Sequence, residues 1–363
     1  FTNASQITSM KLDAGDTFCS GYEKFYQVGN YRVAIPAISA VNTGDLYIPH
    51  IASGDGWWTG VALLNTNPTP TTLTFTFSDG SILPLTLAAG EHWADTVQNI
   101  TSSFPNIDPS ALESAVISNA SGVIGLELFG SQPERLSGVL LSNQTATSLY
   151  YPHIDSSGTW WTGLVAYNPN STSADLTITP YNSSGNSLGS IPVTIAAGGK
   201  YIGTAAALNF PSGTAWFKVD STLPVTGFEL FGTHDGKQLA GYSTVNINTA
   251  QGVFAKLDKE GWTGIAFVNS SNSAATVTLT AKDNEGLTIA TSPLSLAAYE
   301  KQVDLPKEFF TVPITTASYI HFSSDQEVVG FQLNGSADGM MLDGLPGMKT
   351  STDFTPDDDN DGF

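Results

Sequence analysis

Potentially reactive side chains gather in the stretch YIPHIASGDGWWTGVALLN, which covers residues 47–65. His50 and Asp55 are residue types that transfer protons or bind metals, and the adjacent Trp57 and Trp58 are types that anchor ligands or partner domains. This density suggests either a functional site or the packing centre of a domain. The rest of the chain helps to decide, because the stretch recurs.

The chain repeats three sequence signatures at a regular interval. The tryptophan of the first signature recurs as Trp58, Trp161 and Trp262, at intervals of 103 and 101 residues. LTLAAG-like and GFELFG-like signatures follow it in every copy, and a partial copy of the last one, CSGYEKFY, lies at 19–26. Such a period predicts tandem domains. Their boundaries are 1–45 for a partial repeat, 46–148, 149–250 and 251–349 for repeats 1, 2 and 3, and 350–363 for an acidic tail.

The recurring histidine argues against catalysis. His50 and His153 both lie eight residues before the shared tryptophan, and counting back from Trp262 places Phe254 there in repeat 3. An aromatic ring in place of histidine favours packing over metal binding or proton transfer. The other three histidines form no metal-binding pattern, and no nucleophile or phosphate-binding motif is present, so we expect no enzymatic activity.

A recurring glutamate lies inside an apolar strand. Glu127 and Glu229 are equivalent, and Gln332 replaces them in repeat 3. Glutamate and glutamine share an acceptor oxygen but not an ionisable proton. This exchange favours a structural hydrogen-bond acceptor over a general acid, which would require the carboxyl group.

The two adjacent tryptophans must point to opposite faces of a strand. The one present in every repeat, Trp58 with Trp161 and Trp262, is expected to fill the core of its own sandwich. Trp57 and Trp160 are then the outward members, which Gly261 replaces in repeat 3. Two roles remain open for them, namely packing against a neighbouring domain and stacking on a sugar ring.

The acidic tail carries the one motif with ligand spacing. In DDDNDGF, Asp357, Asp359 and Asp361 alternate before Gly362, as in the first half of a calcium-binding loop. The carboxylate expected at the twelfth loop position would lie beyond Phe363, so the predicted calcium site is incomplete in this sequence. A solvated acidic tail is the equally weighted alternative. The pattern resembles the Asp-rich loops of dockerin and thrombospondin type 3 repeats, which implies a calcium-binding continuation.

The elements that carry these residues are predicted to be strands. Alternating apolar and polar residues flank short turns at 72–87, 174–195 and 275–296, which predicts one β-hairpin in each repeat. The density of short strands and turns indicates an all-β fold of tandem immunoglobulin-like or jelly-roll-like β-sandwiches. Helical turns are expected only at 96–104 and 202–210.

Composition narrows the class of protein. The chain has 33 acidic and 13 basic residues and a net charge of -20, which excludes the clustered basic surface that nucleic acids require. An anionic membrane surface would repel it, and no apolar run reaches the length of a membrane span. Few lysines, abundant Thr, Asn and Gly, and a start at Phe1 that suggests a removed leader favour an extracellular or cell-surface protein.

The combination PHI…WWTG…N, LAAG and GFELFG resembles the β-sandwich repeats of large secreted or surface proteins of environmental bacteria. The resemblance covers residues 46–349 and implies a modular, non-catalytic protein. We therefore expect a structural or adhesive protein that self-associates or binds other surface proteins. It would be a rod of sandwiches, with residues 1–45 donating a strand to a neighbouring subunit of a fibre. The alternative is an array of carbohydrate-binding modules.

Overall fold

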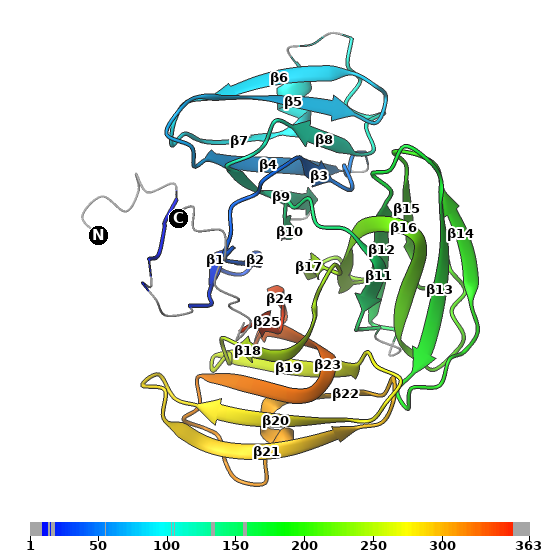
Figure 1. Cartoon of the computed structure of the whole chain (residues 1–363). Helices are drawn as coiled ribbons and strands as arrows, with labels where there is room; N and C mark the ends of the chain where they lie inside the picture. The colour runs from blue at the N-terminus through cyan, green and yellow to red at the C-terminus, as the bar shows by residue number, and fades with distance from the viewer. Residues whose placement is uncertain are drawn as a thin grey trace, which may run out of the picture.

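The computed structural model describes residues 9–13, 15, 19–54, 56–102, 104, 106–131, 135–154 and 158–350. It confirms the all-β prediction, because nearly every regular element is a strand in an antiparallel sheet. Three sandwiches surround a centre where five strands gather, namely β1 Tyr22–Gln27, β2 Tyr31–Pro36, β10 Arg135–Leu140, β17 Leu239–Ser243 and β24 Leu342–Pro346 (Figure 1). Within the described residues, no helix is long and apolar enough to cross a membrane.

Repeat 1 is a sandwich of two four-stranded sheets, β10-β9-β4-β7 and β3-β8-β5-β6. Apolar side chains that alternate along these strands, such as Leu73, Phe75 and Phe77 of β5, form its core. The elements are β3 Leu46–Ile48, β4 Trp57–Asn65, β5 Thr71–Phe77, β6 Ile82–Leu87, β7 His92–Thr96, α1 Val97–Ser102, β8 Ala115–Ser118, β9 Val123–Ser131 and β10 Arg135–Leu140.

Repeats 2 and 3 follow the same plan, but one long strand serves both sheets. In repeat 2, the first part of β16 pairs with β13, and its last part pairs with β12. The strand β23 pairs with β20 and β19 in the same way. The elements of repeat 2 are β11 Ala146–Tyr151, β12 Trp160–Tyr167, β13 Ala174–Asn182, β14 Ile191–Ile195, β15 Lys200–Thr204, β16 Thr214–Thr233 and β17 Leu239–Ser243. Those of repeat 3 are β18 Asn248–Phe254, β19 Gly261–Asn269, β20 Ala275–Lys282, β21 Thr288–Leu296, β22 Lys301–Asp304, the 3-10 helix η2 Pro306–Phe309, β23 Tyr319–Ser336, β24 Leu342–Pro346 and β25 Met348–Lys349.

The three predicted hairpins are present as β5–β6, β13–β14 and β20–β21. The helical turn expected at 96–104 corresponds to α1. The one expected at 202–210 is confirmed only in part: the residues up to Thr204 belong to β15, and a single turn follows, in which the Leu208 amide donates to the Thr204 carbonyl oxygen 3.0 Å away. Its alanines lack a second turn of backbone hydrogen bonds, so no helix develops there.

The N-terminal segment forms the hairpin β1 Tyr22–Gln27 and β2 Tyr31–Pro36. Glu23 faces Ile35 in this hairpin, just as Glu127 faces Val139 and Glu229 faces Tyr242 in repeats 1 and 2. The hairpin is therefore a fourth copy of the hairpin that closes each repeat. The strand β2 packs against β10 and β24, β10 packs against β17, and β17 packs against β24. We call this closed set of four hairpins the hub.

The hub corrects two expectations. The sandwiches do not form a rod, because they lie around the centre where their closing hairpins meet (Figure 1). Apolar side chains of these hairpins pack against the neighbouring repeats. The segment expected to donate a strand to a neighbouring subunit instead pairs with itself and packs within its own chain. Its buried Val33 and Ile35 form an apolar cluster with Leu136 of repeat 1, so the segment packs on repeat 1 of the same chain.

Candidate functional site

The recurring residues meet where the repeats contact one another. One apolar cluster joins repeats 1 and 2 and contains Phe129, Val165 and Phe228; we call it the first interface. A second joins repeats 2 and 3 and contains Phe231 and Phe331; we call it the second interface. Both clusters are separate from the cores of the three sandwiches. The interfaces are therefore the place to look for a site.

The tryptophan shared by all repeats does not fill the core of its own sandwich, which corrects the expectation. Trp58 is half-buried and lies across Gly130 on the neighbouring strand, where a β-carbon would be 2.1 Å from the indole ring. Trp262 lies across Gly335 in the same way, with a closest approach of 2.2 Å. This contact explains why WTG and FG or NG recur together. The ring lies flat on the strand and faces a neighbouring element, so Trp58 packs on the cluster of Val33, and Trp161 and Trp262 pack on the first and second interfaces.

The outward tryptophans also lie at the interfaces. Trp57 packs on the first interface, and the Arg135 guanidinium lies 5.0 Å from the centre of one of its rings. Trp160 packs on the second interface. Gln238 occupies the position of Arg135 in repeat 2, and its amide nitrogen donates to the Met341 carbonyl oxygen 3.2 Å away. No arginine therefore covers Trp160 from that position.

Each of the two recurring histidines, His50 and His153, contacts a lysine of the next repeat. The His50 Nδ1 atom lies 3.0 Å from the Lys200 Nζ atom, and the His153 Nδ1 atom lies 3.1 Å from the Lys301 Nζ atom. Burial, followed by the Lys200 charge, lowers the pKa of His50 to about 3. Burial lowers the pKa of Lys200 to about 8. These imidazoles are therefore neutral acceptors across the interfaces at neutral pH.

The alignment of Phe254 with the histidines is wrong. Phe254 faces Ile320 on β23, as Tyr151 faces Phe217 on β16, so Phe254 is the counterpart of Tyr151. The residue two positions later, Lys256, is the counterpart of His153. The loop before the tryptophan is two residues shorter in repeat 3, which caused the error.

The recurring glutamates are completely buried. Neither carboxylate oxygen of Glu127 has a hydrogen-bond partner among the described residues, and burial raises its pKa well above the usual value. The Tyr242 hydroxyl donates to Glu229, whose pKa burial raises to about 8. Gln332 differs from the expected acceptor role, because its amide nitrogen donates to the Lys256 carbonyl oxygen. These groups face inter-repeat packing and are not exposed to a substrate.

Sequence reasoning missed a set of buried asparagines. The side-chain nitrogen of Asn168 donates to the carbonyl oxygens of Thr172 and Ala196 at 2.8 and 3.0 Å. Asn65 and Asn269 make the matching contacts in repeats 1 and 3, and all three are fully buried. Each one ties the first signature to the LAA turn of the second. The sequence signal that could have revealed them is the asparagine at the end of every strand that begins with the WTG signature.

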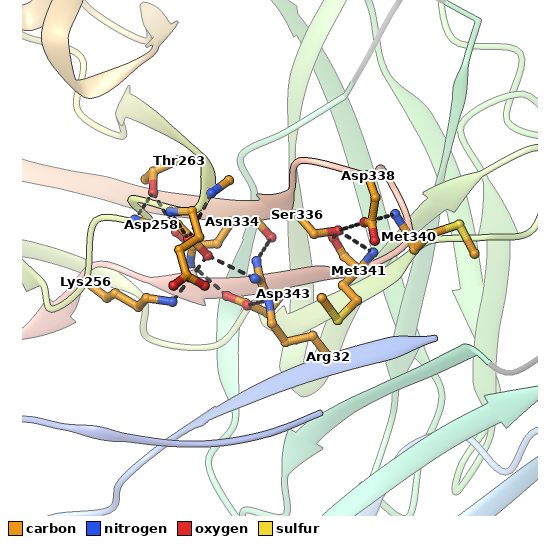
Figure 2. A network of polar contacts seen from close by, with 12 residues as sticks. Arg32, Lys256, Asp258, Thr263, Asn334, Ser336, Asp338, Met340, Met341 and Asp343 are labelled. Carbon is orange, nitrogen blue, oxygen red and sulfur yellow. Dashed lines mark hydrogen bonds and ion pairs between the residues drawn. The ribbon is translucent and has the colours of Figure 1, made fainter. Parts of the chain in front are cut away.

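A polar network replaces the apolar interface where repeat 3 meets the N-terminal hairpin (Figure 2). The buried Arg32 guanidinium pairs with Asp258 at 2.9 Å and with Asp343, and donates to the Asn334 carbonyl oxygen. The Asn334 amide donates to Asp343 at 2.7 Å. Two carboxylates thus hold one guanidinium from the hairpin, and Lys256 lies 3.2 Å from Asp258 at the edge. These contacts fix the hairpin to repeat 3 and close the hub.

The second interface also contains a partly open cavity of about 230 Å³. Its walls are mostly apolar, and Val303, which is 52% exposed, lies at its mouth. The lining residues are His153, Trp160, Thr162, Phe231, Trp262, Gly264, Ile265, Ala266, Val303, Phe331 and Leu333. This cavity is a candidate binding site.

The predicted calcium ligands Asp357, Asp359 and Asp361 lie outside the described residues. Among the residues that are described, no group of three or more His, Cys, Asp or Glu side chains is placed to hold a metal ion.

Comparisons with known proteins assign no family. No protein-family model and no curated protein matches the chain. A tetra-tandem repeat from the extending region of a large adhesion protein is 15% identical over 90% of this chain and 80% of the other, with a TM-score of 0.13. Two glycosidases, Bacteroides uniformis beta-glucuronidase 2 and a GH2 beta-galacturonidase from Eisenbergiella tayi, are 13% and 10% identical over 60% and 82% of this chain, with TM-scores of 0.15 and 0.16. The chain spans 28% and 45% of their lengths. TM-scores this low carry no assignment.

Proposed function

We propose that the chain is a non-catalytic structural or adhesive protein of the extracellular space that acts as a rigid, closed platform. The observation that supports this proposal most strongly is the hub, in which four hairpins of matching register pack against one another in a closed set. The recurring tryptophans and histidines, which a binding or catalytic site would need, lie at contacts between repeats. A surface made of the outer sheets of three sandwiches is then available for self-association or for other surface proteins.

The buried glutamates support the absence of catalysis. A glycosidase needs a pair of carboxyl groups that reach the scissile bond. Glu127 and Glu229 are fully buried in different repeats, and the equivalent Gln332 has no carboxyl group. Calcium binding by the Asp-rich tail belongs to the same proposal, as a means of attachment.

A carbohydrate-binding array remains the alternative. It requires tryptophan rings that a sugar can reach. Trp57 lies beneath Arg135, which weighs against it, whereas Trp160 lines the cavity at the second interface. Trp160 is therefore the residue on which this alternative depends.

One experiment on the full chain separates these functions. The purified protein is tested for hydrolysis of a panel of chromogenic glycosides and esters, and for retention on a glycan array beside the Trp160→Ala variant. We expect no turnover above buffer and no retention that depends on Trp160. Turnover that Glu229→Gln abolishes would establish an enzyme, and retention lost in Trp160→Ala would establish a sugar binder. Either result would overturn the proposal.

A further inference from the structure

The two interfaces between sandwiches are built from equivalent residues, yet the cavity of about 230 Å³ lies at the second. Val165 faces Phe228 in repeat 2, and Ala266 faces the equivalent Phe331 in repeat 3, so the second interface lacks two methyl groups at this position. Arg135 covers Trp57 at the first interface, whereas Gln238 in the same position turns to Met341. Two substitutions thus leave room beside Trp160.

We propose that the cavity at the second interface is a binding site for a small, free, apolar molecule with a planar ring system. A dry cavity of about 150 Å³ lined by apolar side chains is large enough to hold benzene. The cavity here, of about 230 Å³, has room for a fused two-ring molecule such as indole. Trp160, Trp262 and Phe331 supply aromatic faces and edges for offset or edge-to-face contact.

The polar groups around the cavity select against sugars. Nδ1 of His153 is already engaged with Lys301, and Thr162 is only 4% exposed. A monosaccharide would have to bury several hydroxyl groups without partners, which is costly. A planar apolar ring has no hydroxyl groups to leave without partners, and the exposed Val303 marks the way in. The proposed site adds a small-molecule ligand to the platform of the proposed function. It does not depend on the adhesive role of that platform.

The test uses the full chain with its tryptophan side chains labelled with nitrogen-15. The chain has seven tryptophans, so its indole N–H resonances form a small set that can be assigned by single Trp→Phe variants. Indole is titrated as the probe, and glucose is titrated in parallel. We expect saturable shifts in the resonances of Trp160 and Trp262 with indole, unchanged resonances for Trp93, and no shifts with glucose.

Two cavity-filling variants make the test specific. Ala266→Val restores the residue found at the first interface and is expected to weaken indole binding at least about ten-fold. Gly264→Ala narrows the same cavity without a clash, because its β-carbon would lie 3.5 Å from Trp262. Val165→Ala makes the opposite change at the first interface and is the matched control, expected to leave binding unchanged.

Three outcomes would overturn the proposal. They are the absence of saturable shifts, equal binding by the folded Ala266→Val and Gly264→Ala variants, and shifts of Trp160 with glucose in place of indole. Thermal unfolding shows that each variant is folded. Failure of this test leaves the proposed platform function intact, because that function is tested by turnover and glycan retention.

Discussion

At the scale of single residues, the recurring side chains contact one another. Trp58 lies on Gly130, and Asn168 holds the turn at Ala196, so residues of one signature bind residues of another. His153 contacts Lys301 of the next repeat. The period of a sequence shows that each repeat needs a residue, but not whether that residue faces its own core or a neighbour. This is why the recurrence of the tryptophans could be predicted and their location could not.

Glu229 should make stability depend on pH. Burial raises its pKa to about 8 from 4.5, so the folded chain keeps a proton that the unfolded chain releases. Its stabilising effect is complete below pH 4.5 and is lost as the pH rises towards about 8. Above pH 6.5 the histidines, whose pKa burial lowers, no longer oppose this trend. We therefore expect the melting temperature to fall between pH 6.5 and 8.

The variant Glu229→Gln, which installs the residue found at position 332, should reduce this fall. Each proton contributes a slope of up to about 1.4 kcal/mol per pH unit, and Glu127 retains its share in the variant. Unfolding in urea at several pH values measures the slope. Identical slopes for the parent chain and the variant would mean that Glu229 is already ionised in the folded state.

At the scale of elements, the strands follow from local pattern. Alternation predicted β5–β6, β13–β14 and β20–β21 because one face of each hairpin is buried in its own sandwich. The role of β1–β2 did not follow. The partial copy at 19–26 was visible in the sequence, but its place in the hub depends on β10 and β24, which are distant in the chain. Partners this distant leave no local pattern.

Arg32 fixes the N-terminal hairpin to repeat 3, and its position is apolar in the other three hairpins. Leu136, Leu239 and Leu342 occupy the place of Arg32 in the shared register. Arg32→Leu leaves buried carboxylates without their guanidinium, so we expect a loss of about 3–5 kcal/mol in unfolding free energy. Chemical denaturation measures this loss.

A double variant tests the cause of that loss. Asp343→Ala installs the residue found at Ala240, its counterpart in repeat 2. Combined with Arg32→Leu, it removes one of the buried charges, and we expect it to recover a large part of the lost stability. Losses that simply add in the double variant would show that the two side chains do not act as a pair.

At the scale of the whole molecule, the repeats act together because their contacts are apolar and shared. The first and second interfaces bury aromatic side chains that would be exposed in a rod, such as Phe129, Phe228 and Phe331. Exposure of such patches is unfavourable for a protein in water. In the sequence, the closed arrangement is indicated only by aromatic residues that the sandwich cores do not use. Those residues can be recognised only once the cores are known.

Small-angle X-ray scattering of the full chain tests the closed arrangement most directly. A compact chain of 363 residues has a radius of gyration of about 21 Å. We predict a value close to this for the parent chain, with a single-peaked distribution of interatomic distances. A markedly larger radius, with a distribution extended like that of three sandwiches in line, would contradict the closed hub.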